Sequence, residues 1–195
     1  MPQVARCRGW LRLLVSAAAV LVAAERAEAQ VGAVGNPRVI TLSALRAGTL
    51  TVGVLSGMVQ NLPNVQDNAL NDWPTQVVIM TQWNVNPGQT NTVNLMAYFS
   101  TPAQALVGGA IQIPSSRVRA RMTTGLPVAF TPFTQNAVGG IGTAGGSLRL
   151  FSQNITGINK NSSRTDNLDL QLDLVGTTLL PGTYTGTLNI RAVTQ

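Results

Sequence analysis

Three arginines at alternate positions form a group of like charges in the sequence. Arg117, Arg119 and Arg121 are separated by single residues, and side chains two positions apart share one face of a β-strand. Such a cationic strip could bind an anionic polysaccharide, a lipid headgroup or nucleic acid. We favour a solvent-facing strip paired across strands with Asp169 and Asp173, because three arginines without interleaved aromatic side chains are a weak nucleic-acid signal. We therefore expect no nucleic-acid partner.

The carboxylates after residue 28 are all aspartates, at positions 67, 72, 166, 169 and 173. A hydrolase built on two aspartates, or a calcium site using Asp166 and Asp169 or the loop pair Asp67 and Asp72, remains open as an alternative. In Asn167–Val175, however, leucines and polar residues alternate, so that Asp169 and Asp173 belong to the opposite face from the leucines. We favour a solvated polar face over a metal site.

Most of the residue types used in catalysis are missing. The chain has no histidine, its single cysteine is Cys7, and its only glutamates are Glu25 and Glu28. This composition excludes Ser-His-Asp and Cys-His nucleophile systems, the usual zinc sites and acid–base pairs that contain glutamate. We expect a protein that is not an enzyme, with no catalytic residue, no metal and no cofactor.

Two further features are weaker candidates for a site. Gly140–Gly145 matches the spacing GxGxxG, but the dinucleotide fingerprint requires a following helix, and the alternation in Ser147–Phe151 predicts a strand. We expect a surface loop instead. Trp73 lies in the polar stretch Asn71–Pro74 and is the aromatic side chain to test for exposure. Together with the three arginines, it is a candidate contact for a ligand or partner.

Residues 1–29 have the layout of a secretory signal peptide. Three arginines precede the apolar run Leu13–Ala24, and Ala27 and Ala29 form a small-residue cleavage site before Gln30. Twelve apolar residues are too few for a membrane-spanning helix, which needs about 20. We expect cleavage to leave residues 30–195 as a single domain with no membrane span and no cysteine. Its expected location is secreted, periplasmic or at the cell surface.

The elements that must position these residues are strands. Apolar and polar residues alternate in seven segments, and Pro- and Gly-containing turns separate them. The segments are Thr49–Leu55, Gln76–Val85, Thr92–Ser100, Arg117–Met122, Ser147–Phe151, Asn167–Val175 and Tyr184–Val193. The connections are too short for helical crossovers, which predicts an all-β, antiparallel fold. We favour a sandwich over a barrel, with its core drawn from Leu50, Val52, Val77, Ile79, Trp83, Val93, Leu95, Leu168, Leu170, Leu172, Leu188 and Ile190.

The segment Leu180–Gln195, LPGTYTGTLNIRAVTQ, resembles the last strand of bacterial spore coat U-type and related fimbrial subunits. The resemblance covers about sixteen residues, and the expected domain lacks the cysteine pair common in those subunits. It implies an exported immunoglobulin-like β-sandwich with an incomplete edge. In such subunits, that edge accepts a strand from a periplasmic chaperone or a neighbouring copy.

These observations lead to one expected function and one alternative. We expect a non-catalytic structural or adhesive cell-envelope protein, a pilin-like subunit that assembles through β-strand addition. The alternative is a free-standing secreted module that binds carbohydrate or another anionic surface ligand. Val31–Leu45 is either a donor arm or the first strand of the domain itself. We favour the first strand, because exposed sheet edges are normally paired within a domain.

Overall fold

The structure is a computed structural model that describes residues 48–88 and 90–195. All of these residues belong to one compact unit. The expected signal peptide and the segment Val31–Leu45 lie outside the described residues. Within the described part, no helix is both long and apolar enough to cross a membrane.

The described residues form an all-β structure with almost no helix, and every pair of neighbouring strands is antiparallel. The strands are β1 (Thr49–Ser56), β2 (Leu70–Asp72), β3 (Val77–Asn84), β4 (Thr92–Tyr98), β5 (Leu106–Gly108), β6 (Ile111–Ile113), β7 (Val118–Met122), β8 (Thr131–Pro132), β9 (Ser147–Asn154), β10 (Asn161–Asp173) and β11 (Asn189–Thr194). Two single turns of 3₁₀ helix, η1 (Pro102–Gln104) and η2 (Ser115–Arg117), complete the elements.

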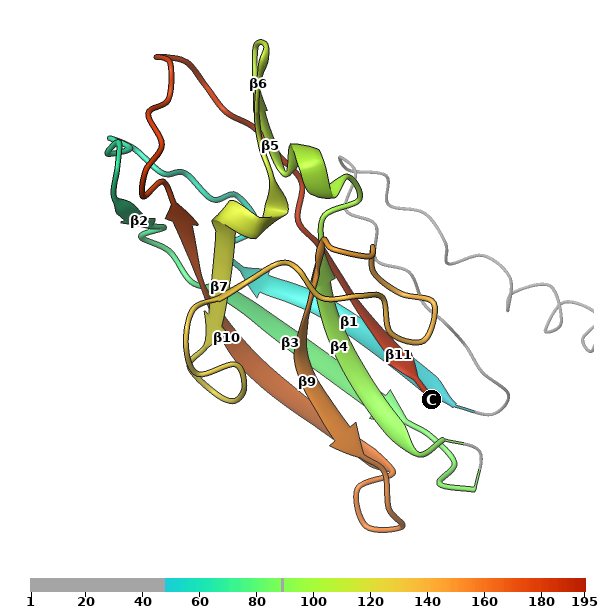
Figure 1. Cartoon of the computed structure of the whole chain (residues 1–195). Helices are drawn as coiled ribbons and strands as arrows, with labels where there is room; N and C mark the ends of the chain where they lie inside the picture. Colours follow the sequence, from blue (N-terminus) through green and yellow to red (C-terminus); the bar gives the residue numbers. More distant parts are fainter. Residues whose placement is uncertain (1–47, 89) are drawn as a thin grey trace, which may run out of the picture. The chain divides into compact units, whose positions relative to one another are not determined.

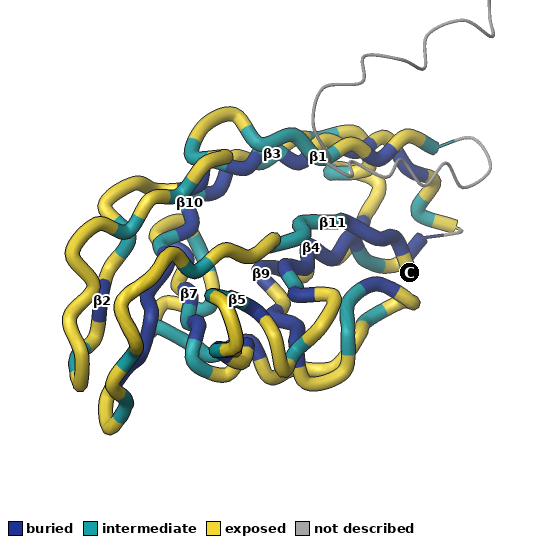
Figure 2. The backbone as a smooth tube through the Cα atoms, turned by 90° about the horizontal axis from the view of Figure 1, so that it is seen from above, coloured by how far each residue is buried: buried dark blue, intermediate teal, exposed yellow. Residues whose placement is uncertain are grey.

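Two sheets pack face to face (Figure 1 and Figure 2). The first has the order β1-β3-β10-β7-β8, with β2 also paired to β10. The second has the order β11-β4-β9, and β5 and β6 form a separate hairpin. The long strand β10 is central, because its first half pairs with β3 and its second half with β2, while β7 lies along its other edge.

The core between the sheets follows from the two-residue alternation, which places one side-chain set inward. Ile79, Leu95 and Leu168 are fully buried there, and burying each such side chain stabilises the fold by about 1.5–3 kcal/mol relative to exposure. Phe99 and Phe133 meet edge to face with their ring centroids 5.2 Å apart. The sheets are therefore joined by a continuous apolar layer.

All seven predicted segments contain a strand, but two of them begin elsewhere. β10 begins at Asn161, six residues before the predicted start. β11 begins at Asn189 and not at Tyr184. The preceding residues pass the β5–β6 hairpin, where Thr185 exchanges backbone hydrogen bonds with Val107 at 2.8 and 3.0 Å. Gly186 lies so close there that a Cβ would overlap the carbonyl oxygen of Ala105.

The glycine-rich segment 135–146 lies on the outer face of the second sheet. Its Ile141 is buried against Met96 of β4 and Val193 of β11. Gly142 has φ +105°, and a Cβ at this position would overlap the Ser147 hydroxyl, so that glycine is required for the close approach. The segment leads directly into β9 and not into a helix, as the alternation of Ser147–Phe151 predicts.

Candidate functional site

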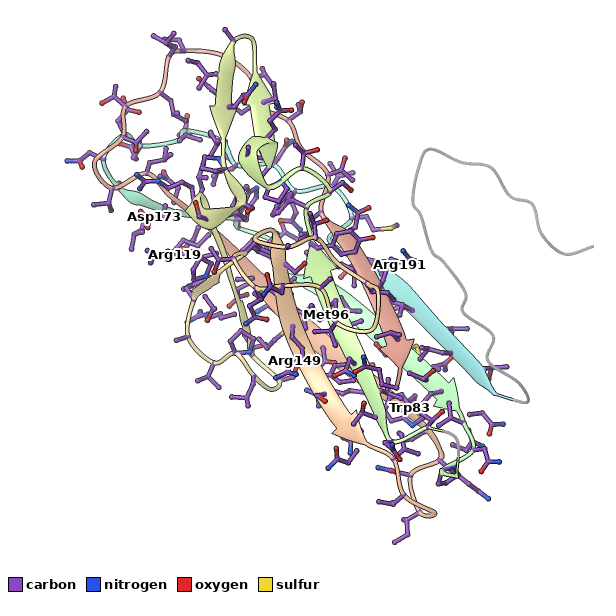
Figure 3. The ribbon with its side chains drawn as sticks, turned by 45° about the vertical axis from the view of Figure 1, so that its right-hand side comes forward. Trp83, Met96, Arg119, Arg149, Asp173 and Arg191 are labelled. Atoms are coloured by element: carbon purple, nitrogen blue, oxygen red, sulfur yellow. The ribbon has the colours of Figure 1, made fainter. Side chains whose placement is uncertain are left out.

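The arginine strip is paired with aspartates of β10, and the predicted cross-strand pairing is confirmed. Arg121 Nε donates to Asp169 Oδ2 at 2.9 Å, and Arg119 forms an ion pair with Asp173 (Figure 3). Arg117, in η2, lies 3.9 Å from Asp173 and donates to the carbonyl oxygen of Val175 at 2.9 Å. Because each guanidinium has an acceptor within the chain, the strip offers an external anion much less charge than three free arginines would.

The polar face of β10 is less solvated than its alternation predicts. Leu168, Leu170, Leu172 and Leu174 are buried, as expected. On the opposite face, Asp173 is only 7% exposed and Gln171 only 6%, so that the expectation of a solvated face is wrong at these two positions. Arg119 pairs with Asp173, and Gln171 Nε2 donates to Asp72 of β2 at 2.7 Å.

Asp166 forms a buried ion pair that the sequence analysis missed. Its side chain is 0% exposed, and Arg164 Nη2 lies 2.7 Å from its Oδ1. Thr124 Oγ1 also donates to this carboxylate at 2.9 Å, and the Arg164 guanidinium lies 4.7 Å from the centroid of the Phe151 ring. The sequence carried one signal of this burial. Arg164 and Asp166 are an even number of positions from Leu168, so that they share the inward face of the strand with the leucines.

The remaining carboxylates and Trp73 are held by other contacts. Asp67 Oδ1 accepts a hydrogen bond from the backbone N–H of Leu179 at 2.9 Å. Trp73 is partly buried and packs against the core, while its backbone N–H donates to the carbonyl oxygen of Leu170. Within residues 48–88 and 90–195, no three histidine, cysteine, aspartate or glutamate side chains gather to hold a metal.

The least complete part of the fold is the edge where β1 and β11 run side by side (Figure 1). β1 pairs only with β3, and β11 only with β4, among the residues that the structure describes. No backbone hydrogen bond joins β1 to β11 across that described edge. On the same side of the molecule, both strands therefore have backbone N–H and C=O groups without a partner among the described residues, and such groups can pair with another strand.

The apolar side chains at this edge are incompletely covered. Val52 and Val54 of β1 contact the core but are only partly buried, and the same holds for Leu188 and Ile190 at β11. Their neighbours one strand further in are covered completely, for example Ile79 in β3, opposite Val54, and Ala97 in β4, opposite Ile190. We call the surface formed by Val52, Val54, Leu188 and Ile190 the open edge.

Not all of this side is uncovered. Leu50 of β1 and Ala192 of β11 are buried, and the strands run in opposite directions along the edge (Figure 1). The incomplete coverage therefore concerns the half that contains the end of β1 and the start of β11. Near this end of β1, Leu55 is exposed, and beyond the strand the chain continues with the exposed apolar residues Met58 and Val59.

No family model matches this chain. No curated protein matches it either.

The open edge is suited to binding and not to bond chemistry. Its side chains are aliphatic, and its polar groups are backbone N–H and C=O groups. An added strand would pair with these groups and place alternate side chains against the apolar surface, which is how β-strand addition provides both affinity and register.

Proposed function

We propose that this protein is an exported, non-catalytic structural or adhesive protein of the cell envelope, a pilin-like subunit that assembles through β-strand addition. The acceptor is the open edge, and the added strand comes from a second copy of the chain, with a periplasmic chaperone as an earlier partner. We further propose that the domain is an immunoglobulin-like sandwich.

The order of the strands supports this proposal. A constant-type immunoglobulin sandwich has strands A, B, E and D in one sheet and C, F and G in the other. Here β1, β3, β10 and β7 correspond to A, B, E and D, and β4 and β11 correspond to C and F, while β9, on the other side of β4, has no counterpart in that scheme. No described strand corresponds to G, whose place is the free side of β11.

The observation that carries the proposal is the incomplete burial of inward-facing aliphatic side chains at this place. Complete burial of an aliphatic side chain is worth about 1.5–3 kcal/mol relative to full exposure. An added strand that covers the open edge gains part of this free energy for each of its four aliphatic residues. The strand also forms hydrogen bonds with the free backbone groups of β1 and β11. Both the apolar contacts and the backbone hydrogen bonds therefore favour binding of an added strand.

The alternative of a free-standing binding module has less support. Its anionic ligand requires available cationic side chains, but Arg117, Arg119 and Arg121 are engaged by β10 and its flank. Its carbohydrate ligand requires an exposed aromatic platform, and Trp73 packs against the core. We therefore retain assembly as the function that the geometry favours.

Disulfide crosslinking between different copies tests the proposal. The expected mature chain has no cysteine, so that one copy can carry Val54→Cys and another Ile40→Cys, Leu42→Cys or Ala44→Cys, three alternate positions of Val31–Leu45, the candidate donor arm. We expect oxidation of co-expressed variants to give a reduction-sensitive dimer with at least one donor position.

The control and the contradicting result are equally direct. Leu55→Cys places the thiol on an exposed neighbouring side chain and should crosslink much less. A crosslink that forms only when both cysteines are in one chain would show that Val31–Leu45 is the first strand of its own domain. That result would reject strand exchange between copies.

A further inference from the structure

A second candidate surface is a cleft of about 370 Å³ between two loops. One loop, which includes Leu62, Val65 and Asp67, connects β1 to β2. The other, which includes Leu180 and Tyr184, connects β10 to β11. Both loops lie at the same end of the molecule in Figure 1. The cleft is distinct from the strands that form the open edge, and a role for it goes beyond the proposed assembly function.

The two loops are fastened to each other by hydrogen bonds. Asn68 Oδ1 accepts from the N–H of Gly176 at 2.7 Å, and the N–H of Asn68 donates to the carbonyl oxygen of Thr177 at 3.0 Å. Asp67 Oδ1 accepts from the N–H of Leu179 at 2.9 Å. The walls of the cleft are therefore set in advance of any ligand.

Side chains that usually avoid water line the opening of the cleft. Leu180 is 65% exposed and Val65 is 39% exposed. The hydroxyl of Tyr184 donates to the carbonyl oxygen of Leu180 at 2.9 Å, which holds the aromatic ring against the same wall. The cleft thus combines a fixed shape with accessible polar and aliphatic surface.

The charge in the cleft comes from Asp67. Asp166, Asp169 and Asp173 each form an ion pair with arginine. Asp67 forms none with any lysine or arginine in residues 48–88 and 90–195, and its side chain is exposed. Its bond to the N–H of Leu179 uses one carboxylate oxygen, which leaves the carboxylate able to accept a further, charge-assisted hydrogen bond.

We propose that this cleft binds an alkylammonium group, a short hydrocarbon chain that ends in a cation. The hydrocarbon lies along Leu180 and Val65, and the cation pairs with Asp67. Free aliphatic amines and lysine side chains of a protein share this chemistry, because the lysine stem is apolar and its end is an ammonium. An anion is disfavoured by the carboxylate of Asp67.

Nuclear magnetic resonance titration of the exported protein tests this binding. The probes are n-butylamine, n-butanol and butyrate, which share a four-carbon chain and differ in charge. We expect n-butylamine to shift the methyl signals of Leu180 and Val65, with n-butanol binding about tenfold more weakly and butyrate showing no binding. A fourth probe, lysine blocked at its amino and carboxyl ends, distinguishes a protein side chain from a free amine by binding more tightly than n-butylamine.

Two matched variants identify the carboxylate responsible. Asp67→Asn retains an oxygen that can accept from Leu179 and removes the charge, and it should weaken n-butylamine binding about tenfold or more. Asp72→Asn removes a charge outside the cleft and should leave binding unchanged. Equal binding of the amine and the alcohol, no shift with any probe, or an unaffected Asp67→Asn variant would overturn the proposal. Assembly through the open edge should remain intact in Asp67→Asn, so that the two proposals can fail separately.

Discussion

Two arginines stack on phenylalanine rings and pair with aspartates that differ in burial. Comparing their substitutions measures how burial of the carboxylate changes the contribution of an ion pair to stability. Arg164 lies 4.7 Å from the Phe151 centroid and pairs with Asp166, while Arg121 lies 4.7 Å from the Phe130 centroid and pairs with Asp169. The carboxylates differ in environment, because the side chain of Asp166 is 0% exposed and that of Asp169 is 17% exposed. We predict that Arg164→Ala destabilises the fold far more than Arg121→Ala.

The expected magnitudes follow from the partner that each substitution leaves behind. Arg164→Ala leaves a buried carboxylate whose remaining side-chain donor is Thr124, and removing one member of a buried pair costs about 3–5 kcal/mol. Arg121→Ala leaves Asp169 near water and still bound by Gln76 Nε2 at 2.7 Å, so that the loss should be about 1 kcal/mol or less. In a domain of this size, the loss expected for Arg164→Ala corresponds to a decrease in Tm of about 6–20 °C. The loss expected for Arg121→Ala corresponds to a decrease of at most about 4 °C.

Thermal and urea unfolding, followed by circular dichroism, measure both variants against the unchanged protein. The double variant Arg164→Ala/Asp166→Ala is the internal control, because it removes the uncompensated charge and should recover part of the stability lost in Arg164→Ala. Equal losses in Arg164→Ala and Arg121→Ala would refute the reasoning. So would a double variant that is no more stable than Arg164→Ala.

Three further predictions concern single positions. Thr81→Val should raise the free energy of unfolding by about 1 kcal/mol in urea titration, because the hydroxyl of Thr81 is buried without a partner among the described residues; a loss of stability would contradict this. Gly186→Ala should cost about 1–3 kcal/mol, since the added Cβ meets the backbone of Ala105, whereas Gly182→Ala has open space and should be nearly neutral. Mass spectrometry of the exported protein should place its first residue at Gln30, and an intact leader would reject the predicted cleavage.

The alternation of side chains along each strand was the reliable signal in the sequence. All twelve predicted core residues belong to the core or contact it. Val52, Leu188 and Ile190 are the three among them that are not fully buried, and all three lie at the edge between β1 and β11. Alternation tells which face of a strand is apolar, but burial also depends on the neighbouring strand, and strand order involves contacts between distant parts of the chain.

The same limit explains the features that were missed. Burial of Asp173 depends on Arg119 and Arg117, which approach from a different segment. The cover over Met96 depends on Ile141, in a glycine-rich segment whose composition indicated only a surface loop. The inward position of Asp166 could be predicted, because it alternates in step with the leucines of the same strand. Its partner Thr124, however, lies 42 positions away in the sequence. Contacts of this kind cannot be derived from local periodicity.

Electrophoresis of the native protein in SDS, without and with boiling, tests the central claim of assembly through the open edge most directly. Strand addition predicts a ladder of polymers that survives SDS at room temperature and collapses to monomer on boiling, since withdrawing a strand breaks many hydrogen bonds and apolar contacts together. Deleting residues 31–45 should abolish the ladder and leave a subunit that is folded or held by a chaperone. A protein that remains monomeric at high concentration, and that unfolds when residues 31–45 are removed, would contradict the account.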